Sequence, residues 1–206
     1  MMREGLKALI AQQEGLTVVG EADNGKSTVA MARNLGVHVV VMDVAMPDLN
    51  GIEATRKIIA SGRGIKVVAL SGHADRQFVA EMLKAGASAY VLKQRAYEDL
   101  VRAIREVMSG RTYLSPEVTR GVVDLYLHGA VTPGEKPAFA TLTSREREVL
   151  QCLAEGKSAK VMAADMGVSE KTIATHRRNI MEKLNLHSVA ELTKYAIREG
   201  VTSVDV

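Results

Sequence analysis

The stretch LTSREREVLQCLAEGKSAKVMAADMGVSEKTIATHRRNIMEKL, residues 142–184, contains three closely spaced helical patterns, and the third points most clearly to a function. Ser169, directly before that third pattern, is a residue type that commonly caps a helix N-terminus. At about 100° per residue, Ile173, Ile180 and Leu184 fall on one side of this helix. The sequence therefore predicts a helix that packs on its neighbours through a narrow aliphatic stripe.

The opposite side of the same helix is polar. It carries Lys171, Thr175, Arg178 and Glu182, with Ala174 beside them, and the run from Lys171 to Arg178 has three cations and no acid. A cationic first half suits insertion of the helix N-terminal end into the major groove of double-stranded DNA. Glu182 would be repelled by phosphate, so we expect it beyond the groove. The same pattern also fits an ordinary solvated amphipathic helix.

A dense set of motif residues runs through this region: Leu142-Thr143, Arg145-Glu146, Gly156, Val168-Ser169, Thr172-Ile173, His176, Ile180 and Lys183-Leu184. With these residues, the region from about residue 142 to residue 200 resembles the four-helix helix-turn-helix domain of the LuxR/FixJ/NarL family. One departure is Lys160-Val161-Met162-Ala163, where the family usually has Lys-Glu-Ile-Ala and therefore one more scaffold carboxylate.

The resemblance implies that Ala174, Thr175 and Arg178 occupy the base-contacting positions. Lys160, Lys171 and Lys183 are our candidates for phosphate contacts, which give affinity and register but no sequence information. The resemblance also implies homodimers on paired DNA half-sites. The last predicted helix, about residues 188–199, offers a stripe for such a two-fold contact, formed by Val189, Leu192, Tyr195 and Ala196.

Length and composition allow one large domain or two small ones, because the chain has 206 residues and 47% of them are apolar. A net charge of +3 does not by itself indicate a nucleic-acid partner, so any DNA-binding charge must be local to one face. The single cysteine, Cys152, excludes an internal disulfide framework and fits a reducing cytosol. We find neither a membrane-span pattern nor a signal peptide, so we expect a cytoplasmic protein without a membrane partner.

The first part of the chain alternates between strand and helix patterns, which predicts a parallel α/β sheet with right-handed crossovers. Residues 37–43 are nearly all β-branched, as in a strand buried on both faces. The expected strands are 16–22, 37–43, 65–71 and 88–93, and the expected helices are 1–13, 25–36, 52–61, 75–86 and 97–110.

The sequence predicts a connecting helix over 115–129, and the stretch 130–140, with two prolines and no periodicity, is expected to be a flexible linker. We therefore expect an α/β domain over 1–114, a connection over 115–140 and an all-α helix-turn-helix domain over 141–206.

Three polar residues end successive predicted strands. Asp43 ends the most apolar strand, Ser71 ends the next, and Lys93 ends the last. The carboxyl ends of parallel strands meet at one edge of a sheet, so these groups could accept, hydrogen-bond and neutralise a phosphoryl group. Asp43 would be the nucleophile, as in aspartyl-phosphate chemistry. Taken singly, each has an ordinary alternative: a helix cap, a loop hydroxyl and a solvated lysine.

These residues resemble the receiver domain of response regulators, over about residues 3–108. The resemblance implies phosphoryl transfer from the phosphohistidine of a sensor histidine kinase to Asp43, with Ser71 and Lys93 binding the phosphoryl oxygens. It also implies that Tyr90 packs differently in the two states. Together with the helix-turn-helix, this is the NarL/FixJ type of DNA-binding response regulator, a transcription factor rather than a metabolic enzyme. The motif residues are Asp43-Val44-Ala45-Met46-Pro47, Gly51, Ser71, Gly86-Ala87, Tyr90 and Lys93.

The sequence departs from the receiver pattern at its start. The family begins with a central strand that ends in a pair of acids binding Mg²⁺, whereas this sequence starts inside the first helix. We therefore expect an N-terminally truncated flavodoxin-like sheet and an incomplete Mg²⁺ site, with only Asp43 and the Ala45 carbonyl. One explanation is a start codon assigned too late; the other is a degenerate receiver that serves as an interaction or dimerisation module. For the chain as written, we expect weak or no phosphorylation.

A second motif suggests a different function, nucleotide binding. Residues 20–27, GEADNGKS, match the G-x-x-x-x-G-K-S pattern of phosphate-binding loops and lie between a predicted strand and helix. However, Glu21 and Asp23 would face the polyphosphate that such a loop binds, and the receiver family often has a similar loop here. Nucleotide binding is therefore the less favoured alternative.

Overall fold

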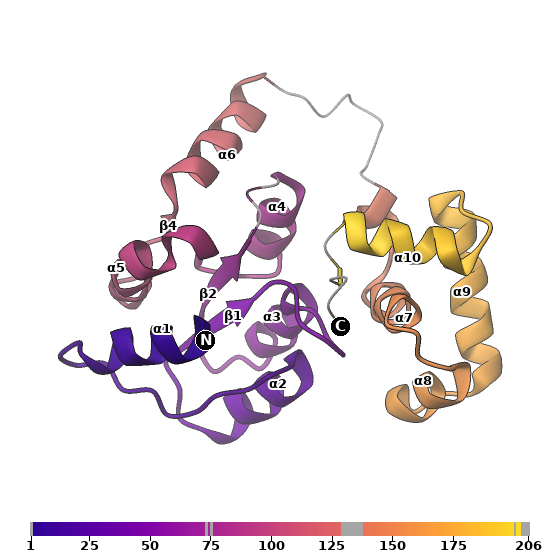
Figure 1. Ribbon diagram of the computed structural model, residues 1–206, viewed down its shortest axis with the longest axis horizontal. Helices are drawn as coiled ribbons and strands as arrows, with labels where there is room; N and C mark the ends of the chain where they lie inside the picture. Colours follow the sequence, from indigo (N-terminus) through magenta and orange to yellow (C-terminus); the bar gives the residue numbers. More distant parts are fainter. Residues whose placement is uncertain (1, 73, 75, 129–137, 200, 203–206) are drawn as a thin grey trace. The chain divides into compact units, whose positions relative to one another are not determined.

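The computed structural model describes residues 2–72, 74, 76–128, 138–199 and 201–202 (Figure 1). The chain divides into two compact units. The first comprises Met1–Val44 and Gly51–Gly129, and the second comprises Ala45–Asn50 and Ala130–Val206.

The first unit is built on a sheet of four parallel strands in the order β1-β2-β3-β4. Val41 lies opposite Val68, and Ala69 opposite Tyr90, which fixes the register of the three longer strands. The predicted parallel α/β sheet is therefore confirmed. The strands are β1 (Val39–Asp43), β2 (Lys66–Ser71), β3 (Ala89–Leu92) and β4 (Tyr113–Leu114).

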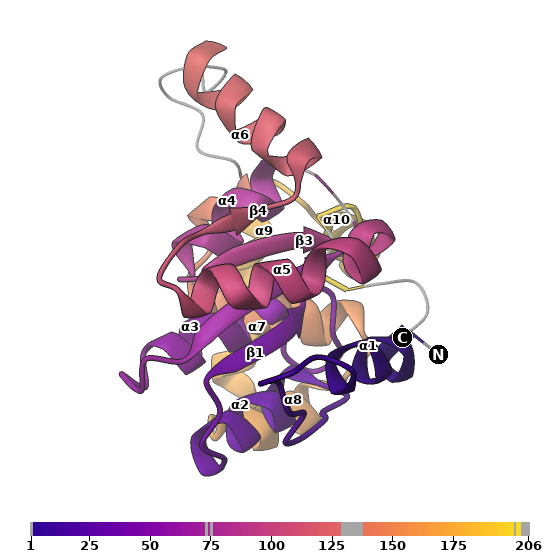
Figure 2. The same ribbon diagram turned by 90° about the vertical axis from the view of Figure 1, so that its left-hand side faces the viewer.

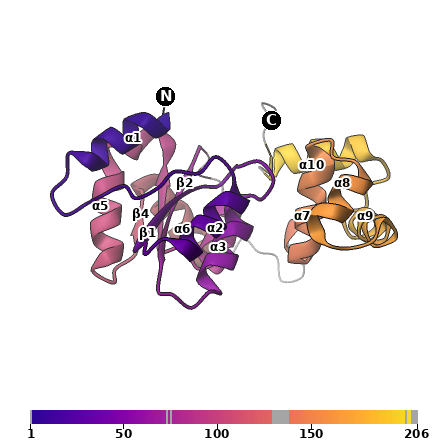
Figure 3. The ribbon, with the colours of Figure 1, turned by 90° about the horizontal axis from the view of Figure 1, so that it is seen from below.

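Helices cover both faces of this sheet (Figures 2 and 3). On one face lie α1 (Met2–Ala11) and α5 (Ala96–Met108); on the other lie α2 (Gly25–Asn34), α3 (Gly51–Ile59) and α4 (Arg76–Lys84), with α6 (Pro116–His128) against α4. Successive side chains of a strand point to opposite faces, and both central strands, β2 between its end residues and β3 along its length, are built from buried, mainly apolar residues. The core on the α1 and α5 face contains Leu6, Val68, Leu70, Ala89, Val91, Leu100, Ala103, Ile104 and Val107.

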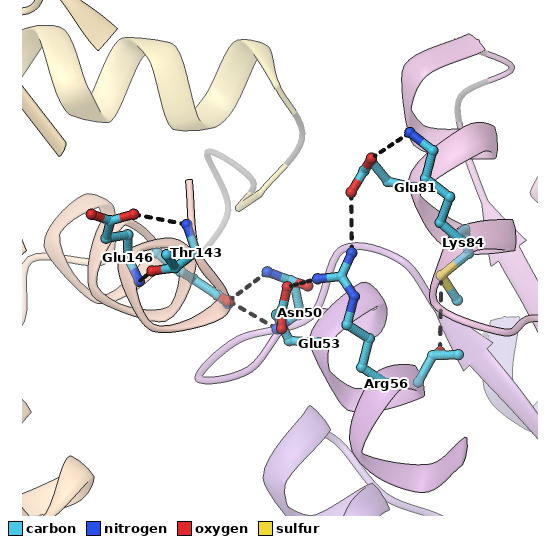
Figure 4. Close-up of polar contacts among 10 residues, drawn as sticks. Asn50, Glu53, Arg56, Glu81, Lys84, Thr143 and Glu146 are labelled. Atoms are coloured by element: carbon cyan, nitrogen blue, oxygen red, sulfur yellow. Dashed lines mark hydrogen bonds and ion pairs between the residues drawn. The ribbon is translucent and has the colours of Figure 1, made fainter. Parts of the chain in front are cut away.

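Ion pairs join α3 to α4 (Figure 4). Arg56 pairs with Glu53 on its own helix and with Glu81 on α4, at 3.1 Å from Nη2 to Oε2. Lys84 also reaches Glu81, at 3.2 Å. These cations compensate two buried carboxylates, which would otherwise be costly to remove from water.

Two predictions about the first unit are wrong. Residues 16–22 form no strand, and Val39, Val40 and Val41 are half-buried rather than buried on both faces. Within the described residues β1 pairs only with β2, so it is an edge strand. A strand exists only through hydrogen bonds to a neighbour, and no described segment provides one for residues 16–22.

The structure also contains a short strand that the sequence did not predict. Tyr113 and Leu114 pair with Ala89 and Tyr90 as β4. The next residue holds this strand in place, because the Ser115 hydroxyl donates to Asp99 Oδ2 at 2.9 Å and accepts from the Leu92 amide at 3.3 Å. Between β3 and α5 lies a 3₁₀ turn, η1 (Lys93–Arg95).

The second unit contains the four predicted helices, each preceded by a capping residue. Thr143 and Glu146 form a reciprocal capping box at the first helix (Figure 4). Ser158, Ser169 and Ser188 cap the next three with their side chains. The helices are α7 (Ser144–Ala154), α8 (Ala159–Met166), α9 (Glu170–Leu184) and α10 (Val189–Arg198).

One aliphatic core holds these helices together. Cys152 is buried in it and acts as a small apolar side chain, as its position in an apolar run predicts. The core also includes Leu142, Val149, Leu150, Leu153, Met162, Ile173, Ile180, Leu184, Leu192 and Ala196.

A short 3₁₀ helix, η2 (Ala138–Thr141), begins within the stretch 130–140 that the sequence predicts as linker. Phe139 is buried in the core, and the Arg147 guanidinium lies 4.9 Å from the centre of its ring. A phenylalanine has a large apolar area to bury, which explains why Phe139 packs into this core. Residues 130–137 lie outside the described residues.

Tyr195 gives the second unit a predicted dependence on pH. Burial raises the pKa of this phenol to about 12, above its value of 10.0 in water. The phenol therefore ionises at a lower pH in the unfolded chain than in the folded one. The free energy of unfolding keeps its full value below pH 10 and falls as the pH rises towards 12. Between pH 10 and pH 12 we expect the free energy of unfolding of wild type to fall by roughly 2 kcal/mol more than that of Tyr195→Phe, as measured by denaturant unfolding. If the free energies of unfolding of the two proteins changed with pH in parallel, the raised pKa of Tyr195 would be wrong.

Candidate functional site: a phosphoacceptor edge and a DNA-facing helix

The carboxyl edge of the sheet brings Asp43 and Lys93 together. Asp43 is the last residue of β1, and Lys93 directly follows β3. The Lys93 ammonium lies 2.7 Å from Asp43 Oδ2, and about one third of each side chain is exposed. Ser71, the last residue of β2, is buried on the strand between them. This edge therefore presents a carboxylate with its charge balanced by a lysine, next to a strand that ends in a hydroxyl.

Gly51 lets α3 approach the end of β1. Its amide donates to the Val44 carbonyl at 2.9 Å, and a Cβ on Gly51 would overlap the Asp43 carbonyl oxygen. The Val44 amide in turn donates to the Leu70 carbonyl at 3.0 Å. These contacts hold the backbone of Asp43 between the sheet and the first turn of α3.

Tyr90 lies inside the first unit. It is fully buried on β3, opposite Ala69 on one side and Leu114 on the other. In this state its ring is part of the core.

The described residues do not fit a Mg²⁺ ion. Among them, no three His, Cys, Asp or Glu side chains lie close enough together to hold a metal. Asp43 is paired with a cation, and Ala45 could add only a backbone carbonyl. Mg²⁺ requires near-octahedral oxygen coordination, which one paired carboxylate and one carbonyl cannot supply without many waters.

In the loop that matches a phosphate-binding motif, side chains and backbone groups form hydrogen bonds with one another. The Asn24 side chain caps α2 by accepting from the Ser27 amide at 2.8 Å, and the Ser27 hydroxyl donates back to the Asn24 carbonyl. Hydrogen bonding from Lys7 holds the pKa of the Glu21 carboxyl below its usual value, so an anion faces this loop. This geometry argues against a bound polyphosphate.

The helix α9 has the two faces that its sequence predicts. Ile173, Ile180 and Leu184 are buried, which confirms the aliphatic stripe. The Ser169 hydroxyl accepts from the Thr172 amide at 3.1 Å and fixes where the helix begins. On the outer face, exposed side chains belong to Lys171, Ala174, Thr175, Arg178 and Glu182.

Two of these outer residues have internal contacts that cost little to release. The Thr175 hydroxyl donates to the Lys171 carbonyl at 3.0 Å, as is common for threonine in helices. Arg178 Nε lies 3.9 Å from Glu182 Oε1, and both side chains are 70% exposed. A solvent-exposed pair of this kind contributes at most about 1 kcal/mol. Lys160, in the first turn of α8, is also exposed.

Lys183, for which the sequence predicts a phosphate contact, is paired within its own unit in this structure. Its ammonium lies 2.7 Å and 2.9 Å from the two carboxylate oxygens of Glu146 and 3.4 Å from the Thr141 carbonyl. Burial raises the pKa of Glu146, but hydrogen bonds from Lys183 and Thr143 outweigh it and lower the pKa overall. Lys183 therefore stabilises the capping box of α7, and its partner is too distant in sequence for a helical pattern to reveal.

The structure corrects the prediction that an apolar stripe on α10 forms a two-fold contact. Leu192, Tyr195 and Ala196 are buried in the core of their own unit. An apolar stripe can cover either a domain core or a partner, and periodicity does not distinguish the two. The large apolar side chains exposed on this helix are Val189 and Ile197, at 40% and 36%.

The Lys183–Glu146 pair generates a prediction about stability. In Lys183→Met the buried carboxylate of Glu146 loses its cation, and we expect the free energy of unfolding to fall by about 1–2 kcal/mol, discounted for the partly exposed lysine. Lys160→Met removes an exposed ammonium and serves as the matched control, with an expected change within about 0.5 kcal/mol. Equal stabilities of the two variants in denaturant unfolding would rule out this role for Lys183.

No helix among the described residues has the length and apolar character needed to span a membrane.

Comparisons with known proteins identify the family of each part of the chain. Residues 1–105 match the family described as response regulator receiver domain, and residues 140–196 match the bacterial regulatory proteins of the luxR family. The chain is 33% identical over 205 residues to response regulator UvrY of Escherichia coli strain K12, covering 100% of this chain and 93% of UvrY. It is 34% identical over 206 residues to response regulator GacA of Pseudomonas protegens, covering 100% of this chain and 95% of GacA.

A solved structure of RcsB from Salmonella enterica serovar Typhimurium, bound to a promoter in the presence of the phosphomimetic BeF3⁻, matches with a TM-score of 0.58 and 25% identity. The match covers 97% of this chain and 93% of that one. These findings confirm both resemblances that the sequence shows. The chain belongs to the response regulators that join a receiver domain to a luxR-family DNA-binding domain.

Proposed function

We propose that this protein regulates transcription by binding double-stranded DNA through α9, under the control of its receiver unit. The observation that carries the proposal is the division of α9 into a buried aliphatic stripe and an exposed face with Lys171, Thr175 and Arg178. The stripe fixes the helix on its unit, so the outer face is presented as a rigid surface. RcsB, a structural relative, was solved bound to a promoter.

In this proposal Thr175 and Arg178 contact base edges, and Ala174 makes apolar or close backbone contact. An arginine can donate to both O6 and N7 of guanine in the major groove, which gives it sequence discrimination. Lys160 and Lys171 contact phosphates and set the position of the helix on the duplex. The protein binds as a homodimer on paired half-sites and acts in the cytoplasm. Its functional parts are the receiver over 1–114, the connection over 115–140 and the DNA-binding domain over 141–206.

The proposed input is phosphoryl transfer from a sensor histidine kinase to Asp43. A carboxylate oxygen of Asp43 would attack phosphorus as the N–P bond of the phosphohistidine breaks. Lys93, now paired with Asp43 at 2.7 Å, would turn to the new phosphoryl oxygens, and Ser71 would hydrogen-bond them. Tyr90 would change its packing with this switch. Receiver domains of this family typically bind Mg²⁺, but the donor set in the described residues does not fit that ion.

The Asp43–Lys93 pair also favours a second candidate function. A carboxylate whose charge is already balanced, without a fitting metal site, is a weaker phosphoacceptor. The receiver unit could then serve as an interaction or dimerisation module in a DNA-binding regulator that does not depend on phosphate.

The variant Arg178→Ala tests whether Arg178 contacts base edges. We expect the affinity for a selected duplex to fall by a factor corresponding to about 1–3 kcal/mol, with relaxed preference at one base pair. Selection from a random-sequence pool at one fixed salt concentration measures both effects. Arg178→Lys keeps the charge without the forked donor geometry and should also lose the preference. An unchanged footprint and affinity in Arg178→Ala would remove Arg178 from the base-contacting set.

Labelling with acetyl phosphate separates the two candidate functions. We expect slow labelling that is insensitive to Mg²⁺ and absent in Asp43→Ala, because the donor set offers no fitted site for the ion. Rapid labelling that requires Mg²⁺ would contradict our interpretation of the metal site. If wild type takes no label and its DNA affinity is the same with and without the phosphodonor, the phosphate-independent function is correct.

A further inference from the structure

We propose that Arg177 binds a backbone phosphate of the same DNA half-site that α9 reads, through a groove beside the helix. This inference rests on the proposed function and adds a contact that supplies affinity and salt dependence without sequence discrimination.

The groove lies along the flank of α9. Its walls come from Ala159 at the start of α8, Ile173, Ala174 and Arg177 on α9, and Val189 at the start of α10. Three cations line it, Lys157, Lys171 and Arg177, against one acid, Glu170. This balance of charge suits an anion, and the groove adjoins the helix that we propose enters the major groove.

Arg177 has its charge available. It is exposed, and it makes no hydrogen bond or ion pair within the part of the chain that the structure describes. Of the two other cations that line the groove, Lys157 lies 3.5 Å from Glu155, whereas Lys171 is exposed and is the residue that we already assign to a phosphate contact. A guanidinium without an internal partner can meet a phosphate without first breaking a contact.

The angular position of Arg177 assigns it to the backbone rather than to the bases. Four residues after Ile173, it lies about 40° from the buried stripe, well away from the face that carries Thr175 and Arg178. A helix about 10–12 Å across fills a major groove about 12 Å wide, so its flanks face the two sugar-phosphate backbones. A long side chain on that flank therefore meets phosphate.

The test uses the full chain, a duplex selected by wild type from a random-sequence pool, and a mixed-sequence duplex. Affinity for both is measured by fluorescence anisotropy across a range of salt concentrations. In Arg177→Ala we expect both affinities to fall by the same factor and the slope of log K against log salt to decrease in magnitude by about 0.9, the value for one phosphate contact. Arg177→Lys should restore most of the slope, because a phosphate contact needs charge and not a forked donor.

Two further variants sharpen the result. Lys194→Ala removes one exposed cation from α10 outside the groove and should leave the slope unchanged. Val189→Glu places an acid on the groove wall without removing a cation, and should weaken binding to both duplexes. A wild-type slope in Arg177→Ala would overturn the proposal, and so would a change of base preference in that variant. If wild type shows no salt-sensitive binding to any duplex, the proposed function itself fails, and this inference fails with it.

Discussion

Burial of Ile173, Ile180 and Leu184 is the interaction on which the proposed function depends. These three side chains lie on one side of α9 and are buried against α7 and α8. Each buried aliphatic side chain contributes roughly 1.5–3 kcal/mol relative to exposure, so the orientation of α9 about its own axis is firmly set. The outward direction of Thr175 and Arg178 follows from that packing. Ser169 and the Lys183–Glu146 pair then fix where the helices begin.

The receiver unit follows from a different constraint, the geometry of parallel strands. Because β1, β2 and β3 run in the same direction, their last residues collect at one edge, and this alone brings Lys93 to Asp43. Gly51 adds the close approach of α3 to that edge. The chemistry of the edge then depends on what balances the charge of Asp43. In this state it is Lys93, which links any change at Asp43 to the segment that follows β3.

Local periodicity predicted much of this structure. The stripe on α9, the alternation of strands and helices, and the strand-end positions of Asp43, Ser71 and Lys93 all depend on residues close in sequence. Local patterns do not show the contacts that depend on residues distant in sequence. Lys183 pairs with Glu146, 37 positions earlier, and residues 16–22 lack a neighbouring strand among the described residues. The stripe on α10 could not be assigned to core or partner by pattern alone. The two residues of β4 are too few to show any period.

The central claim is that the outer face of α9 enters a DNA duplex, and site-specific photo-crosslinking tests it most directly. A crosslinking amino acid is placed at Thr175 in one protein and at Lys194, exposed on α10, in another. Our account predicts crosslinks to bases of a selected duplex from position 175, lost as salt is raised, and few or none from position 194. Crosslinks from position 194 with none from position 175 would contradict it.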